Sequence, residues 1–137
     1  MAAAELICKL FHARTAAHMA HLQTTSYAQH KALNDFYDGI VGLADDFAET
    51  YQGIFGLIGP YPEMAMPSGK PAEWIDGLRT WLKEYRKECC QGETPLENIH
   101  DEIQALCAST VYKLKYLDNP TMTTGPSADG IMKMSKW

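Results

Sequence analysis

The sequence lacks the patterns that mark several large classes of protein. No uncharged run approaches the ~18 residues of a membrane-spanning helix, so we expect no transmembrane segment. Glu5 and Lys9 interrupt the apolar N-terminus, which argues against a signal peptide. Basic residues are few and scattered: 12 Lys and Arg stand against 17 Asp and Glu, a formal net charge of −5. Since DNA binding depends on clustered basic residues, this balance argues against it.

Disulfide and zinc-type cysteine patterns are also absent. The four cysteines, Cys8, Cys89, Cys90 and Cys107, form no CxxC spacing, and adjacent Cys89 and Cys90 have poor geometry for a disulfide with each other. This usage predicts unpaired thiols in a reducing cytoplasm. The chain also has no strand-like alternation of apolar and polar residues and no internal repeat, so an all-α fold is favoured.

Apolar residues recur every three or four positions in four segments, which predicts helices over residues 3–24, 27–55, 72–90 and 94–117. The stretch Thr24-Thr25-Ser26 is expected to provide a break and the cap of the second helix, and Thr94 with Glu97 to form a capping box at the start of the fourth. Tyr85 is expected to face the core of the third helix. The predicted core stripe of the second helix is Leu33, Phe36, Tyr37, Ile40, Ala44, Phe47, Ala48, Tyr51, Ile54 and Phe55.

A segment rich in glycine and proline, residues 56–71, separates the first pair of predicted helices from the second pair. Two helices, a long link and two more helices is the layout of a ferritin-like four-helix bundle with one long crossover connection. We therefore expect a single bundle domain over residues 1–117. Residues 118–137 are rich in Pro, Gly, Thr and Ser and are expected to form an irregular C-terminal tail.

The second helix carries a stripe of side chains of the kinds that bind iron: His30, Asn34, Asp38, Asp45 and Glu49. At 100° per residue this stripe lies roughly 120–130° from the core stripe, which places it on the outside of the subunit. His30 and Asp45 are about 22 Å apart along the axis at ~1.5 Å per residue, so one chain cannot bring both to one metal. Two antiparallel copies of the helix, related by a two-fold axis, can do so, and His18 on the first helix can reach the same place.

Three glycines, Gly39, Gly42 and Gly53, lie beside this stripe and are expected to let another helix approach closely.

Two alternatives to a shared metal site stay open. Any solvated helix face carries such polar residues. Glu97-Asn98-Ile99-His100 also matches the Glu-x-x-His of di-iron bundles, but that design needs a second copy, which the sequence lacks. His12 is expected at the surface and His21 half-buried, neither as a ligand.

The spacing of the stripe resembles the signature of the Dps family, the DNA-protection-during-starvation proteins or miniferritins. That signature has a His, a second His twelve residues later, then Asp at four, Asp at eleven and Glu at four. The chain has His18, His30, Asn34, Asp45 and Glu49 at these spacings, with Leu33, Phe36 and the closing Asp-x-x-Ala-Glu also similar. Two positions depart: Asn34 stands where the family has a carboxylate, and Met19 where a tryptophan is usual. The short chain is similar to Dps-like proteins of tailed-phage genomes.

The resemblance implies a bundle that assembles through two-fold dimers into a hollow shell, usually a dodecamer. It implies a ferroxidase, which binds Fe(II) at two-fold interfaces, oxidises it with hydrogen peroxide or dioxygen, and stores ferric iron inside. His18 and His30 would be nitrogen ligands, Asp45 and Glu49 carboxylate ligands from the partner, and Asn34 a weak or outer contact. Zinc would be a non-redox occupant of the same site. The expected location is the cytoplasm, that of a bacterial host if the gene belongs to a phage. The alternative is a ferritin-like structural or assembly protein whose site is inactive because of Asn34.

Overall fold

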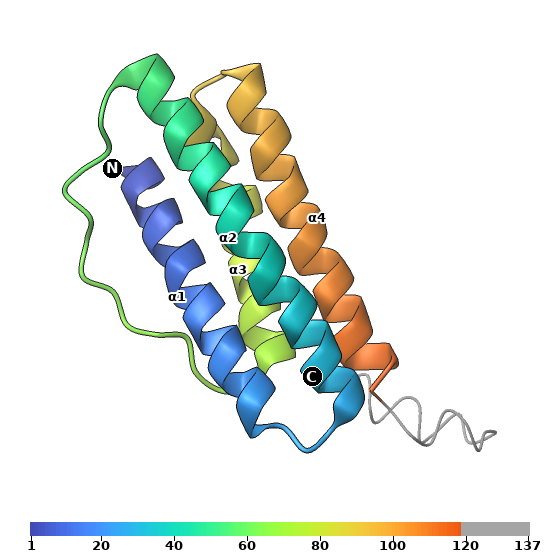
Figure 1. The fold of residues 1–137 in the computed structure, drawn as a ribbon. Helices are drawn as coiled ribbons and strands as arrows, with labels where there is room; N and C mark the ends of the chain where they lie inside the picture. Colours follow the sequence, from blue (N-terminus) through green and yellow to red (C-terminus); the bar gives the residue numbers. More distant parts are fainter. Residues whose placement is uncertain (119–137) are drawn as a thin grey trace.

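The protein is an all-helical bundle of four helices in a computed structural model that describes residues 1–118 (Figure 1). The helices are α1 (Ala2–Gln23), α2 (Tyr27–Phe55), α3 (Pro71–Cys90) and α4 (Thr94–Tyr116). Their bounds agree with the predicted ones to within a residue, because the apolar period and the turn residues carry local information. The expected tail after residue 118 lies outside the described residues. No strand occurs within residues 1–118.

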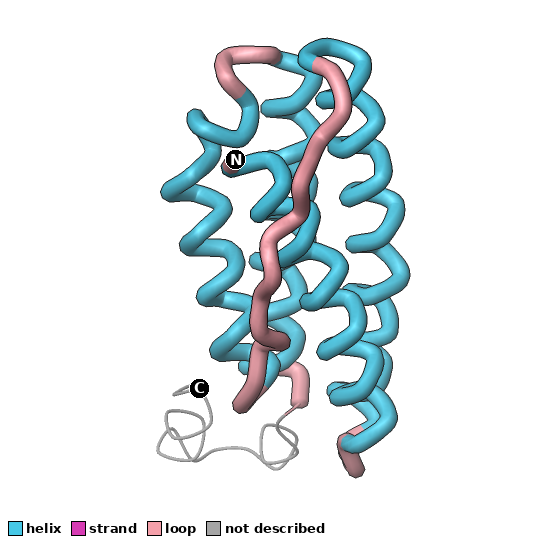
Figure 2. Tube along the Cα trace, turned by 90° about the vertical axis from the view of Figure 1, so that its left-hand side faces the viewer, coloured by secondary structure: helices cyan, strands magenta, loops and turns pink. Residues whose placement is uncertain are grey.

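Each helix packs against two neighbours, in the order α1, α2, α4, α3 around the bundle. The α1–α2 and α3–α4 connections are short, so the helices of each pair are antiparallel. The segment 56–70 runs along the length of the bundle from the end of α2 to the start of α3 (Figures 1 and 2). As a result α2 and α3 run in the same direction. The predicted four-helix bundle with one long crossover connection is therefore the observed topology.

The rotation of α2 about its own axis is fixed by the side chains that it buries. Leu33, Phe36, Ile40 and Phe47 have no exposed surface, and Tyr51 is 4% exposed. Each such side chain contributes about 1.5–3 kcal/mol by leaving water. Turning the helix would expose this stripe, so the opposite face is held outward.

Two members of the predicted stripe of α2 were wrong. Ile54 is 40% exposed and Phe55 is 44% exposed. The last turns of α2 extend past the first turn of α1, so nothing from α1 covers them there (Figure 1). The apolar period of one helix does not predict how far that helix extends past the end of its neighbour.

Two predictions about α3 and α4 were also wrong. Tyr85 is 37% exposed, because its ring stacks on Trp81 near the surface instead of entering the core. Glu93, not Thr94, precedes the first turn of α4, and no side-chain hydrogen bond caps that helix. Glu97 lies instead 3.6 Å from Nη1 of Arg86 on α3, so it does not complete a capping box.

Arg86 links α3 to α4 through a bidentate pair with Asp101. Its Nε and Nη2 groups donate to the two carboxylate oxygens at 2.8 and 3.0 Å. The hydrogen bond raises the pKa of Arg86 and lowers the pKa of Asp101. At the other end of the bundle, the Ser26 hydroxyl accepts from the Gln29 backbone N–H at 3.1 Å, as predicted for the cap of α2, and donates to Asp118.

All four cysteines are buried and unpaired, as predicted. Burial raises the pKa of Cys89 and Cys107 to about 12 and that of Cys90 to about 11. These three groups therefore stay protonated thiols, which are poor nucleophiles and poor metal ligands. Within residues 1–118, no helix is both long enough and apolar enough to cross a membrane.

His100 is a polar group in the core of the bundle. Its side chain has no exposed surface, and its ring lies 6.4 Å from that of Phe47 on α2. The Gln104 amide lies 3.2 Å from Nδ1, while Nε2 has no hydrogen-bond partner in the described part of the chain. Burial, reinforced by the positive charge of Arg86, lowers the pKa of His100 to about 4; Asp101 opposes this shift. His100 is thus a neutral core residue rather than half of a di-iron motif.

His100 should make the fold sensitive to acid. In the unfolded chain an ordinary histidine takes up a proton near pH 6.5, whereas the folded protein resists protonation until about pH 4. Stability is therefore retained above pH 6.5 and falls as the pH drops toward 4. Linkage gives a loss of about 2 kcal/mol between pH 7 and pH 5 from this one group. His100→Leu should remove about that much of the pH dependence in urea unfolding. An unchanged pH dependence in the variant would contradict the assignment.

Candidate metal-binding half-site

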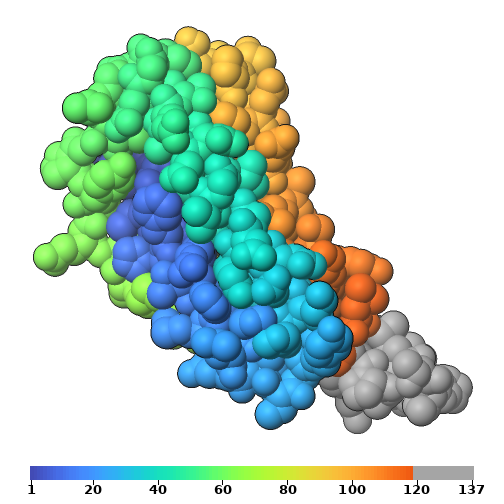
Figure 3. Space-filling model, in the orientation of Figure 1, coloured from blue at the N-terminus to red at the C-terminus, as the bar shows by residue number. Residues whose placement is uncertain are grey.

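The predicted ligand residues of α2 lie on its outward face. Asp45 and Glu49 are exposed, whereas His30 and Asn34 are partly buried. Residues of α2 form the front of the molecule in Figure 3, and no other described segment covers them there. The predicted separation of this stripe from the core is therefore observed.

His30 is held by a reciprocal pair of hydrogen bonds with His21 at the end of α1. The Nδ1–H of His30 donates to the His21 carbonyl at 2.8 Å, and the Nδ1–H of His21 donates to the His30 carbonyl at 2.7 Å. The two rings stack with centroids 3.6 Å apart. Because Nδ1 carries the proton in this arrangement, Nε2 of His30 keeps its lone pair. A metal-bound histidine is usually oriented by just such a bond from its second nitrogen.

Stacked rings do not chelate one ion, because their nitrogen lone pairs point along parallel planes. His21 is 8% exposed and packs between its neighbours, so it positions His30 rather than adding a ligand. Its expected half-burial was an underestimate. The turn between α1 and α2 brings the two histidines together.

Tyr37 connects His18 of α1 to the end of α2 that carries His30. The ring of His18 stacks on that of Tyr37 with centroids 4.1 Å apart and meets His21 edge-on at 5.8 Å. The Tyr37 hydroxyl donates to Oδ1 of Asn34 at 2.8 Å. His18, His30 and Asn34 thus share one neighbourhood, joined through His21 and Tyr37.

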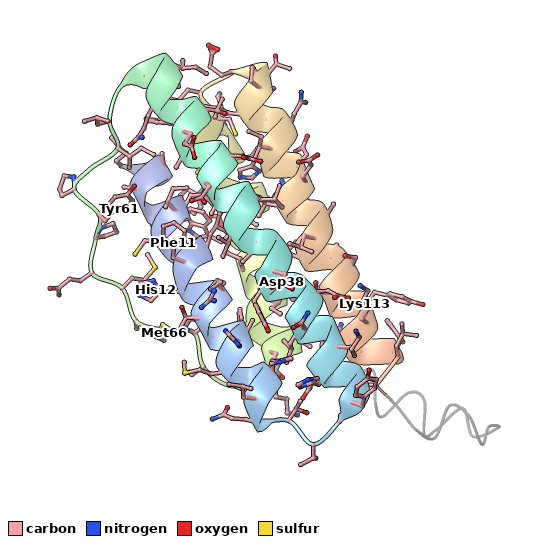
Figure 4. The ribbon with its side chains drawn as sticks, viewed as in Figure 1. Phe11, His12, Asp38, Tyr61, Met66 and Lys113 are labelled. Carbon is pink, nitrogen blue, oxygen red and sulfur yellow. The ribbon has the colours of Figure 1, made fainter. Side chains whose placement is uncertain are left out.

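Asn34 already has partners for both ends of its amide. Oδ1 accepts from Tyr37, and Nδ2 donates to Oδ2 of Asp38 at 3.2 Å. Asp38, one turn along α2, is exposed and points away from the bundle (Figure 4). Asp35 instead lies 3.8 Å from the Lys113 ammonium on α4. Of the two acids near Asn34, Asp38 is therefore the one without a cationic partner in the described chain, and its Oδ1 accepts no hydrogen bond there.

The acidic half of the predicted site lies elsewhere on the same helix. The side chains of Asp45 and Glu49 form no hydrogen bond or ion pair with any residue in the described range. Among residues 1–118, no group of three or more His, Cys, Asp or Glu side chains is placed to hold a metal ion. A single chain therefore brings together the histidine half and leaves the carboxylate half apart, as the rise along α2 requires.

The three glycines beside the stripe have different surroundings in the structure. A Cβ at Gly39 would lie 3.1 Å from Leu106, so this glycine lets α4 of the same chain approach α2. The prediction that Gly39 lets another helix approach closely is confirmed, and that helix is α4 of the same chain. Gly42 and Gly53 meet no atom within 4 Å and remain open to a second helix.

Sequence reasoning missed two residues of this neighbourhood, His21 and Tyr37. The contact between Tyr37 and Asn34 has a local signal, since residues three apart are neighbours on a helix. The contact between His21 and His30 has none, because it depends on how the turn at residues 24–26 folds.

The fold and this face define the protein as a four-helix bundle. Its histidine and carboxylate groups lie at separate positions along the outward face of α2. The chain belongs to a family of unknown function, DUF5856, which residues 21–114 match. This match includes His30, Asn34, Asp45 and Glu49 and leaves His18 outside. No curated protein and no solved structure matches the chain.

Replacing His21 tests its structural role, which is to hold His30 in place. His21→Ala removes a buried ring and one hydrogen bond, and should cost about 2–3 kcal/mol in the free energy of unfolding. His21→Asn retains a donor near the position of Nδ1 and should lose roughly half as much. Urea unfolding of both variants measures this difference. Equal losses in both variants would mean that the hydrogen bond to the His30 carbonyl contributes nothing.

Proposed function

We propose that the protein is a Dps-like miniferritin that binds and oxidises Fe(II) at two-fold interfaces and stores ferric iron in a hollow, dodecameric shell in the cytoplasm. One observation carries the proposal: the histidine half and the carboxylate half of an iron-type ligand set lie on one outward face, and neither is complete. Zinc would occupy the same ligands without redox chemistry.

Two subunits with antiparallel α2 helices would join the halves. His18 and His30 of one subunit would then face Asp45 and Glu49 of its partner, and the two-fold axis would repeat the arrangement. Open surface at Gly42 and Gly53 supports the approach of a second helix. The lone pair on Nε2 of His30 supports its role as a nitrogen ligand.

The charges on this face support the same pairing. The guanidinium of Arg14 lies 5.8 Å from the centroid of Tyr37, at the histidine end, and has no carboxylate partner within residues 1–118. Asp45 and Glu49, at the acidic end, are likewise without a cationic partner in that range. Antiparallel pairing brings these opposite charges together, whereas parallel pairing sets like charges side by side.

In the proposed reaction Fe(II) is the substrate. Each of two Fe(II) ions gives up one electron, and hydrogen peroxide takes both electrons with two protons to form two molecules of water. Dioxygen would be the other oxidant. Carboxylates favour the product, because hard oxygen ligands bind Fe(III) more tightly than Fe(II). The imidazoles position the ions without carrying charge of their own.

A second candidate rests on Asn34. Its amide is a neutral ligand where a carboxylate would add charge, and its oxygen already accepts a hydrogen bond from Tyr37. In this reading the protein is a ferritin-like structural or assembly protein that retains the two-fold interface and has lost the iron reaction.

Mixing two inactive variants tests whether each site is shared between subunits. His30→Ala and Glu49→Ala should each oxidise Fe(II) no faster than buffer, as followed by ferric absorbance. Subunits of the two variants that are unfolded together and refolded at equal amounts should recover about a quarter of wild-type activity. Half of the dimers are then mixed, and one of the two sites in each mixed dimer is intact.

The control for folding yield uses His30→Ala and wild-type subunits that are unfolded separately, then combined and refolded together. Sites formed within one chain would give no recovery from the two variants. An oligomer of normal mass without iron oxidation in the wild-type protein would favour the structural candidate.

Asn34→Asp tests how much the neutral amide lowers Fe(II) affinity and the oxidation rate. A carboxylate at this position adds a negative charge and an anionic oxygen, so Fe(II) affinity and oxidation rate should rise about tenfold, equivalent to about 1.4 kcal/mol. Asp38→Asn is the matched control and should lower both. An Fe(II) affinity and oxidation rate unchanged from wild type in Asn34→Asp would exclude residue 34 from the site.

A further inference from the structure

A cavity of about 310 Å³ lies on the side of the bundle away from the exposed face of α2, between α1, α3 and the crossover segment. Trp74 and Trp81 line it from α3, Lys9 and His12 from α1, and Met64 from the crossover. His12 and Met66 mark where α1 meets the crossover in Figure 4. Its volume is at the lower end of the range for small-molecule sites, and its lining is mostly apolar, as in such sites.

Gly77 opens a gap between the two tryptophans. It lies three residues after Trp74 and four before Trp81, so all three share one face of α3. A Cβ at this position would meet no atom within 4 Å. Glycine inside a helix costs roughly 0.5–1 kcal/mol of stability relative to alanine. Here the missing side chain leaves space between two indole rings and does not serve the close approach of another helix.

The polar groups of the cavity come from α1. The Lys9 ammonium lies 5.0 Å from the centroid of the Trp81 ring and has no ion-pair partner in the described chain. The Nδ1–H of His12 donates to the Cys8 carbonyl at 2.7 Å, which leaves Nε2 able to bond elsewhere. An unpaired cation beside two indole rings matches a ligand with a flat aromatic body and one negative group.

We propose that this cavity binds a small aromatic carboxylate of one or two rings. The aromatic body packs against Trp74 and the edge of Trp81 in the gap at Gly77, and the carboxylate pairs with Lys9. Met64 and its neighbours in the crossover cover the bound ring. The proposal does not depend on the iron reaction, because none of these residues belongs to the histidine or carboxylate halves on α2.

Calorimetric titration of the full-length protein with 2-naphthoate tests the proposal. The wild-type protein should bind one molecule per chain, and neutral 2-naphthylmethanol should bind roughly three- to tenfold more weakly. Lys9→Gln should weaken binding of 2-naphthoate by the same factor and leave 2-naphthylmethanol unchanged. Gly77→Leu should abolish binding of both, since its side chain fills the gap.

Thr80→Leu is the control, because Thr80 is an exposed residue of α3 close to Gly77 that lies outside the cavity and outside the face of α2. It should retain wild-type affinity for 2-naphthoate. Absence of saturable binding to the wild-type protein, or binding that survives Gly77→Leu, would overturn the proposal. Equal affinity for the acid and the alcohol would overturn the role of Lys9. Iron oxidation should be unaffected by Lys9→Gln and Gly77→Leu, so the two proposals fail separately.

Discussion

The buried stripe of α2 is the constraint on which the rest of the structure depends. Leu33, Phe36, Ile40 and Phe47 are enclosed by α1 on one side and α4 on the other, so α2 cannot rotate without exposing large side chains. Burial of this stripe also keeps the opposite face of α2 turned outward. Groups that water solvates well lie there, and their chemistry becomes available to a second molecule rather than to the core.

The long crossover makes a second region of the molecule. By returning along the bundle, it lets α3 start at the same end as α2 and places an irregular segment over the groove between α1 and α3. An irregular segment packs less completely than a helix, since its side chains do not repeat at a fixed spacing. The histidine face of α2 and the aromatic cavity under the crossover are thus separate products of one topology, and each has its own chemistry.

Much of the fold followed from local sequence patterns. Apolar period predicted four helices, and Ser26 predicted the start of α2 correctly because its hydroxyl bonds within its own turn. Thr94 did not cap α4, since Glu97, the other half of the expected box, lies beside Arg86 on a different helix. Ile54 and Phe55 kept the helical period but passed the end of α1. The close approach of a helix at Gly39 was predicted, but not that the helix is α4, because its neighbour Leu106 is 67 positions away in the chain.

The sequence by itself determined the helices, the spacing of His30, Asn34, Asp45 and Glu49 along α2, and the outward direction of that stripe. These follow from a fixed rise and rotation per residue, which any chain position carries with it. Only the tertiary structure decided that His21 holds His30, that Tyr37 holds Asn34, and that Lys9 lies beside Trp81. Except for the one-turn bond between Tyr37 and Asn34, these contacts join different helices. Their offset and rotation are set by the packing of the whole core, so no local pattern encodes them.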